Sequence, residues 1–442
     1  MGGLALWAQR VRATCVHKGL YISSKKARVL LVIDHLSSEG QGHMWPQNFM
    51  IGFPILILEV IIMVRRKLVN IFVCLLLVAC MLMVSAVVVA PRPPEKPGKP
   101  GGDELGTEYQ ITFSEDGGEE WANAIYGNIM IWQSYNFQYQ TGDIYMFDLG
   151  DDGIPYTEDD GEKTGINNDP TTSQMFPGIW ENRIVYTSDE NGNYNVFLYE
   201  IDTGVTTQIT DDPKGQWSPQ IWGDIIVYVD NRNGNRDVYA YDLGTGTEIQ
   251  ITTDTANQQH PYIYGDIVVW TDYRDAVIEQ GMDIYMYKFS TGLEYAVTND
   301  DFTQSNHYIR DNKIVWSDDR NEKQGRRNDL DIYMYDLGPD GIPFTGDLGE
   351  GEYQITSGGR MDFSPKLYGD LVALRGKQET GKITDPSYKS KDDIYICNIN
   401  SGVTNQITNS NKADYPSIFE DHIVYADERD GTNHIYLFIL NP

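Results

Sequence analysis

Cysteine is scarce in this chain. Only four of its 442 residues are cysteines, Cys15, Cys74, Cys80 and Cys397, and only Cys397 lies beyond residue 102. Residues 103–442 therefore cannot form a disulfide among themselves, so we expect their stability to come from packing and hydrogen bonds.

Basic residues are few in the same part of the chain. Residues 103–442 hold 22 of the 34 Lys and Arg residues but 60 of the 64 Asp and Glu residues, and the whole chain has a net charge of −30. A surface this negative repels phosphate backbones, so we expect no nucleic-acid partner. The charge favours cationic partners or a saline, calcium-bearing exterior.

Common catalytic motifs are also missing. The sequence has no G-x-S-x-G elbow, no H-E-x-x-H and no P-loop, although each of these patterns is typical of a large enzyme class. Pairs of carboxylates are too abundant among 60 acidic residues to indicate a glycosidase. The absence of such motifs predicts that the chain is not an enzyme.

The N-terminal region carries the pattern of an export signal. Arg65, Arg66 and Lys67 precede 23 uncharged residues, 68–90, which predicts a cleaved signal peptide or an uncleaved transmembrane anchor over residues 63–90. Residues 91–104 are rich in Pro and Gly and predict a linker. Residues 1–62 have no clear period, and we expect translation to start at Met63. The location predicted is the extracytoplasmic face of the cell envelope, with the protein membrane-anchored or secreted.

Internal repetition is the strongest signal in residues 105–442. One unit contains Ser218–Tyr228, Asp237–Leu243 and Glu248–Thr252, and the following unit repeats the pattern. An Ile or Leu before the first turn recurs at intervals of 42 to 58 residues, at Ile125, Ile179, Ile221, Ile263, Ile309, Leu367 and Ile418. These intervals match propeller blades.

Each unit has four short segments rich in Ile, Val, Tyr and Trp that are separated by Gly, Asn and Asp turns. This predicts an all-β fold, a seven-bladed β-propeller of four-stranded antiparallel blades. The last unit ends at residues 436–442 without a fourth strand, whereas Glu108–Thr112 form an isolated one. We expect the N-terminal strand to complete the last blade and to close the ring.

The units resemble the TolB-like and WD-like propeller repeats. The resemblance rests on Asp230-Asn231-Arg232-Asn233-Gly234 followed by Asp237-Val238-Tyr239, and on Asp318-Asp319-Arg320 followed by Asp331-Ile332-Tyr333. It covers about residues 105–442 and departs from the family in the first turn, which has Gly-Asp or Asp-Asn instead of Ser-Pro-Asp-Gly. The N-terminal α/β domain of TolB has no counterpart. The resemblance implies the fold and leaves the function open.

Acidic and arginine residues recur at equivalent hairpins, and their repetition in most blades favours a structural role. The pairs are Asp230/Arg232, Asp272/Arg274, Asp318/Arg320 and Asp427/Arg429.

The residues just before the first strand of each unit should surround the mouth of the central channel. We interpret them as candidate ligand-binding residues, with packing of the blade tops as the alternative. They are Trp121, Met175, Trp217, Gln259, His260, His307, Phe363 and Tyr415.

His260 and His307 lie within one residue of equivalence on adjacent blades. A metal site needs three or four converging ligands, and the body has only two further histidines, His422 and His434. TolB-like propeller lyases that act on pectic fragments use a histidine-rich central metal site, and this chain lacks enough histidines for one. We predict no cofactor other than calcium, for which two loops are candidates.

Two blades carry similar twelve-residue insertions that overlap the calcium-loop pattern, with acidic residues at positions 1, 5 and 12 and Gly at position 6. Position 3 is glycine, and position 12 is Asp instead of Glu. The alternatives are a calcium site and an acidic surface turn. The candidate ligands are Asp148, Asp152 and Asp159 in the first loop and Asp336, Asp340 and Asp347 in the second.

These features together predict an exported propeller that binds a protein or a glycan at the cell envelope. The alternative is a polysaccharide lyase or glycoside hydrolase with its site in the central channel. We expect a monomeric head, held at the membrane through residues 68–90.

Overall fold

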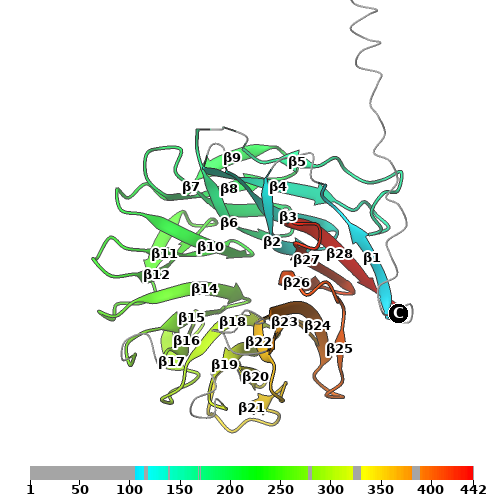
Figure 1. Cartoon of the computed structure of the whole chain (residues 1–442). Helices are drawn as coiled ribbons and strands as arrows, with labels where there is room; N and C mark the ends of the chain where they lie inside the picture. The colour runs from blue at the N-terminus through cyan, green and yellow to red at the C-terminus, as the bar shows by residue number, and fades with distance from the viewer. Residues whose placement is uncertain are drawn as a thin grey trace, which may run out of the picture. The chain divides into compact units, whose positions relative to one another are not determined.

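The computed structural model describes residues 105–113, 118–137, 140–167, 169, 171–276, 281–321, 330–380 and 389–441. These residues form seven four-stranded antiparallel sheets arranged around a central axis (Figure 1), and they contain no helix. The prediction of a seven-bladed propeller is confirmed. The predicted extension 1–62, signal or anchor 63–90 and linker 91–104 lie outside the described residues, and no described segment is a helix able to span a membrane.

Each blade has an inner strand beside the axis, two middle strands and an outer strand. The inner strands are β2 (Glu119–Tyr126), β6 (Gln174–Trp180), β10 (Gln216–Trp222), β14 (Gln258–Tyr264), β18 (Gln304–Arg310), β22 (Met361–Tyr368) and β26 (Ala413–Phe419). The second strands are β3 (Ile129–Asn136), β7 (Arg183–Ser188), β11 (Ile225–Asp230), β15 (Ile267–Asp272), β19 (Lys313–Asp318), β23 (Leu371–Thr380) and β27 (His422–Asp427).

The third strands are β4 (Thr141–Asp148), β8 (Asn195–Glu200), β12 (Asp237–Asp242), β16 (Asp283–Lys288), β20 (Asp331–Asp336), β24 (Lys389–Asn398) and β28 (His434–Leu440). The outer strands are β5 (Thr164–Gly165), β9 (Val205–Gln208), β13 (Thr247–Gln250), β17 (Leu293–Ala296), β21 (Gly351–Gln354), β25 (Thr404–Gln406) and, in the last blade, β1 (Gly106–Gln110).

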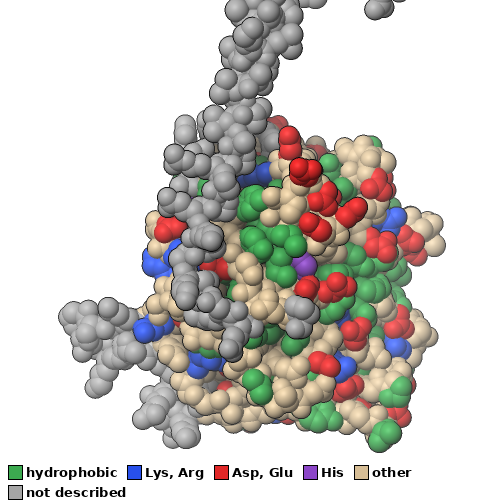
Figure 2. Space-filling view, turned by 90° about the vertical axis from the view of Figure 1, so that its right-hand side faces the viewer, with side chains coloured by type: hydrophobic (Ala, Val, Ile, Leu, Met, Phe, Trp, Pro, Cys, Tyr) green, Lys and Arg blue, Asp and Glu red, His purple; other side chains and the backbone are tan. Residues whose placement is uncertain are grey.

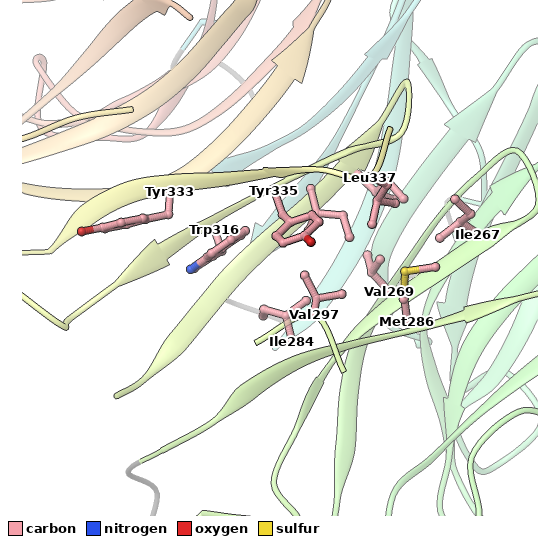
Figure 3. Packing of buried hydrophobic residues seen from close by; sticks show 11 residues of the cluster. Ile267, Val269, Ile284, Met286, Val297, Trp316, Tyr333, Tyr335 and Leu337 are labelled. Carbon is pink, nitrogen blue, oxygen red and sulfur yellow. The ribbon is translucent and has the colours of Figure 1, made fainter. Parts of the chain in front are cut away.

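Hydrophobic packing between neighbouring blades forms the core. One cluster joins the blade β14–β17 to the blade β18–β21: Val269, Ile284 and Met286 of the first lie against Trp316 and Tyr335 of the second (Figure 3). Similar clusters lie between the other adjacent blades. Consecutive residues of the second strands are buried, as in Ile267–Asp272, so each blade buries side chains on both of its faces.

The repeated Asp and Arg residues link the strands of their blades to one another. Asp230, fully buried at the end of β11, accepts a hydrogen bond from the Arg232 backbone N–H (2.7 Å) and pairs with its guanidinium. The guanidinium also pairs with Glu248 of the outer strand (2.6 Å) and lies over the Tyr239 ring. The same arrangement recurs at Arg274, Arg320 and Arg429. The structure thus gives these pairs a structural role, because each arginine ties the second, third and outer strands together.

In the last blade the same arrangement of Asp, Arg and Glu closes the ring. We call the junction of β1 with β28 the seam. β1 pairs antiparallel with β28, so that Glu108 lies opposite Phe438, as the sequence predicted. Arg429 pairs with both carboxylate oxygens of Glu108 (2.8 and 2.9 Å), and the Tyr425 hydroxyl donates to the same carboxylate. Glu108 therefore occupies in β1 the place that Glu248 has in β13, and it joins the two ends of the described body.

We expect Glu108→Ala to lower the free energy of unfolding by about 2–4 kcal/mol, because it leaves Arg429 and Tyr425 without their shared acceptor in a buried seam. Urea denaturation measures the change. The control is Glu248→Ala, which removes the equivalent carboxylate from an interior blade. The Glu248 side chain is 32% exposed and that of Glu108 only 5%, so the control should cost less. Equal losses would show that the seam has no special role.

Candidate functional site at the channel mouth

A bulge in the inner strands shapes one end of the central channel. In β14 the pairing with β15 shifts between Gln259 and Tyr262, and corresponding shifts occur in the other inner strands. Six strands place a non-glycine residue with φ between 49° and 55° at the bulge: Phe176, Ser218, His260, Asn306, Ser364 and Tyr415. This backbone region is uncommon for such residues, and its recurrence makes it part of the blade design.

Among these six strands, the residue after the bulge differs in one blade. Five inner strands place proline there, namely Pro177, Pro219, Pro261, Pro365 and Pro416, whereas β18 has His307. Proline suits a bulge because it has no N–H to donate to the ladder. His260 and His307 are thus one position apart in the repeat, and their side chains have different surroundings: His260 is exposed and His307 is 1% exposed.

A cavity of about 330 Å³ opens at this mouth. Four successive blades contribute to its wall, from β14 to β26, and its lining includes His260, Tyr262, His307, Lys366 and Tyr415. Three of the predicted ligand-binding residues, His260, His307 and Tyr415, therefore line one cavity.

His307 lies deepest among these. Its Nδ1 is 3.1 Å from the Thr271 hydroxyl, and its ring meets Tyr262 edge-on at 5.8 Å between centroids. Its Nε2 is buried and has no partner at hydrogen-bond geometry among the described residues, although backbone groups of His260 and Val269 lie near enough to the ring to oppose the lowering of its pKa. Burial lowers the pKa of His307 to about 3, and the nearby positive charges of His260 and Lys366 act in the same direction. His307 is therefore a neutral imidazole at physiological pH.

Lys366 comes from β22, and its side chain contacts tyrosines of the two preceding inner strands, β18 and β14. Its Nζ donates a hydrogen bond to the Tyr262 hydroxyl (2.7 Å) and lies 4.2 Å from the Tyr262 ring centroid and 4.6 Å from that of Tyr308. These contacts fix the position of the ammonium group and use only one of its three donors in a hydrogen bond.

Arg236 lies at the rim beside His260. Its guanidinium donates to the side-chain carbonyl of Gln259 and lies over the Trp217 ring, 5.5 Å from the centroid. His260 is exposed toward the mouth but has protein on most sides. This burial lowers its pKa, and the charge of Arg236 lowers it further. Gln259 and Trp217, both predicted ligand-binding residues, thus position Arg236 and are not part of the cavity lining.

The other three predicted residues, Trp121, Met175 and Phe363, lie outside the lining. Trp121 stacks on Tyr135 (5.9 Å between centroids), and Phe363 lies beneath the guanidinium of Arg375. Sequence reasoning missed Lys366, Tyr262 and Arg236. One signal was available for Lys366: at the second position after the bulge residue, other inner strands have Gly178, Gln220, Tyr262, Tyr308 and Ser417, and Lys366 alone is charged.

An aromatic collar fills the opposite end of the channel. Its members are the last residues of the inner strands: Tyr126, Trp180, Trp222, Tyr264, Arg310, Tyr368 and Phe419. Neighbouring rings contact one another at centroid distances between 4.1 and 6.3 Å. Arg310 completes the circle, with its guanidinium 4.1 Å from the Tyr368 ring centroid. About 100 Å³ of space remains among the collar residues, so we expect a ligand to enter the channel from the mouth. A separate open hollow of about 660 Å³ lies beside Tyr126 and Phe419 of the collar, and Asp148 and Asp159 of the first insertion are in its wall.

The two insertions with the calcium-loop pattern are held by their own hydrogen bonds. Asp152 and Asp340 each accept a bond from the backbone N–H two residues later (2.8 and 2.9 Å), and Asp148 and Asp336 do the same (3.0 Å each). Asp159 accepts from the Asp151 N–H (2.7 Å), whereas Asp347 donates its own N–H to Glu350 (3.0 Å).

Among the described residues, no three His, Cys, Asp or Glu side chains converge as metal ligands. The carboxylates of Asp148, Asp152, Asp159, Asp336 and Asp340 accept hydrogen bonds from backbone N–H groups. The first insertion also reaches the seam, because His422 Nε2 lies 2.8 Å from the Gly153 carbonyl. Calcium binding at the six aspartates stays a prediction, which a calcium titration of the melting temperature tests.

Comparison with known proteins identifies the fold. No family model matches the chain, and neither does any curated protein. Among solved structures, an oligogalacturonate lyase from Vibrio parahaemolyticus matches with a TM-score of 0.52 and 12% identity, over 76% of this chain and 94% of that one. The β-propeller domain of the Trilobed protease from Pyrococcus furiosus matches with a TM-score of 0.51 and 13% identity, over 74% and 94%. TolB from Acinetobacter baumannii matches with a TM-score of 0.37 and 17% identity, over 73% and 78%.

The chain is a seven-bladed β-propeller, the fold that the resemblance of its units to TolB-like repeats predicts. Identities this low show the fold alone. The expectation that the chain is not an enzyme needs correction, because one of the matched propellers is a lyase and another belongs to a protease. The missing sequence motifs do not exclude catalysis, since a propeller can build a site from side chains that are distant in sequence.

The lowered pKa of His307 makes stability depend on pH. In the unfolded chain this group has an ordinary pKa near 6.5, whereas the folded protein takes up the proton only near pH 3. Between these values acidification favours the unfolded state, by up to about 1.4 kcal/mol per pH unit from this one group. We expect the free energy of unfolding of His307→Asn to fall less steeply between pH 6 and 4 than that of the wild type. Parallel pH profiles in urea denaturation would contradict this.

Proposed function

We propose that the propeller is a recognition module that binds a protein or a glycan at the cell envelope through the channel mouth. The observation that carries this proposal is the cavity of about 330 Å³, whose wall combines three tyrosines, two histidines, a lysine and small polar side chains. Ligand sites of proteins are concave, with aromatic surface and a few fixed polar groups.

The location is part of the proposal. Residues 68–90 are uncharged and follow Arg65, Arg66 and Lys67, a pattern that supports export with the propeller on the extracytoplasmic side. The membrane anchor or signal, and a monomeric head, are proposed on the sequence alone. The acidic surface supports solubility of such a head (Figure 2).

A second candidate function is catalysis in the same cavity, as a lyase or glycoside hydrolase. It is favoured by one observation: the neutral His307 has a buried Nε2 without a partner near the Tyr262 hydroxyl and Lys366. In the tautomer whose Nδ1–H donates to the Thr271 hydroxyl, Nε2 can accept a proton from a substrate, and a hydroxyl or an ammonium group can donate one. Incubation with polysaccharides, followed by assay of unsaturated products and reducing ends, tests this candidate.

We expect the double variant His260→Gly/Tyr415→Gly to lose ligands that the wild type retains on a glycan array or captures from envelope extracts. Glycine removes two side chains that line the cavity, and it fits the positive φ of both positions (55° and 52°). The matched control is Phe176→Gly/Ser218→Gly, which changes the same bulge position in two blades outside the cavity lining.

The control should retain the ligand. Unchanged binding by His260→Gly/Tyr415→Gly would place the site on the rim or on the insertions and would overturn the proposal. Recovery of the ligand unaltered separates recognition from catalysis, because an enzyme would return a shortened product.

A further inference from the structure

The cavity has a charge opposite to that of the body around it. Residues 103–442 contain 60 Asp and Glu, yet none of the described residues that line the cavity is acidic, and Lys366 is among them. Figure 2 shows acidic side chains at several places on the face of the propeller that it displays. A wall without a carboxylate is therefore a local departure from the composition of this chain.

Two cations at the mouth have no carboxylate partner among the described residues. Lys366 contacts Tyr262 and Tyr308, and Arg236 contacts Gln259 and Trp217. Elsewhere the same residue types form ion pairs, as Arg375 does with Asp392 and Asp414 (2.8 and 2.7 Å). Lys366 is half-buried and Arg236 is exposed, and a cation that is held in place without a counter-charge is available to an anionic ligand.

The pKa values of both histidines are lowered by neighbouring positive charges. Apart from burial, the charges that lower the pKa of His307 are those of His260 and Lys366, and the charge that lowers the pKa of His260 is that of Arg236. Positive or potentially positive groups thus follow one another across four blades, from Arg236 through His260 and His307 to Lys366.

His307 supplies the geometry for a neutral donor. When the Thr271 hydroxyl donates to Nδ1, the imidazole carries its proton on Nε2. This Nε2 is buried, has no partner among the described residues and belongs to a side chain in the cavity wall. An acceptor oxygen of a ligand would satisfy it.

We propose that the cavity binds a carboxylate group of its ligand, with Lys366 Nζ as the ion-pair partner, His307 Nε2–H as the hydrogen-bond donor and Arg236 as a charge that attracts the ligand to the rim. This inference rests on the proposed function and specifies its ligand chemistry. Two sources present such a group at the end of a chain, an acidic sugar residue and the C-terminus of a peptide. The tyrosine rings and the hydroxyl groups of the lining can contact either.

Calorimetric titration with matched probes tests the proposal. One pair is glucuronate against glucose, and the other is the dipeptide Gly-Tyr against its C-terminal amide. We expect the acidic member of one pair to bind about tenfold or more tighter than its neutral partner, and the pair that does so identifies the source. Raising the salt concentration should weaken the acidic probe and leave the neutral one unchanged.

Lys366→Met should remove this preference, with a loss of about tenfold or more for the acidic probe alone. The control is Lys313→Met. Lys313 lies at the start of β19 and pairs with Asp336, so this variant should keep the preference. Arg236→Gln, an exposed position, provides a second variant if Lys366→Met does not fold, and it should weaken the acidic probe at low salt.

Equal affinity for acidic and neutral probes, or a preference that survives both variants, would overturn the carboxylate inference. If neither acidic probe binds although the His260→Gly/Tyr415→Gly variant loses the natural ligand, the carboxylate inference is wrong and the proposed function stands. If that double variant keeps the natural ligand, the proposed function fails as well.

Discussion

Closure of the ring by β1 is the constraint on which the other features depend. The channel mouth exists only while seven blades surround one axis, and the chain has no disulfide within its body to hold the first and last blades together. Backbone pairing of β1 with β28, the bidentate contact between Arg429 and Glu108, and a hydrophobic cluster that includes Trp132 and Leu437 perform this task. The Asp–Arg–Glu arrangement at the seam is the same as the one that stabilises the interior blades, so closure needs no additional type of interaction.

The regularity of the blades explains where the cavity arises. Six inner strands repeat the same bulge with a positive φ, and five follow it with proline. Departures from this pattern, His307 in place of proline and Lys366 two positions after a bulge residue, coincide with the cavity wall. Each departure places a basic side chain toward the axis of a strongly acidic body. The local electrostatic field at the mouth therefore differs from the field of the whole surface.

The fold could be predicted from the sequence because each repeat consists of segments rich in strand-forming residues. Ile221, Ile263 and their counterparts mark the inner strands, and six of the seven are almost fully buried. Glu108–Thr112 was recognised as the closing strand because it had no partner in its own unit. The site was harder to predict, since positions near the mouth look equivalent in sequence. Trp121 packs on Tyr135 and Phe363 on Arg375, each within its own blade. The contact of Lys366 with Tyr262 joins residues 104 positions apart. No local pattern encodes such a contact, which depends on the angle between blades.

Amide hydrogen exchange of β1 tests the account most directly. If β1 closes the ring, the amides of residues 106–111 should be protected to the same degree as those of the outer strands β9 and β13, and they should lose protection together with β28 when denaturant is added. Rapid, complete exchange of residues 106–111 while β28 stays protected would contradict closure, and with it the channel mouth on which the proposed recognition depends.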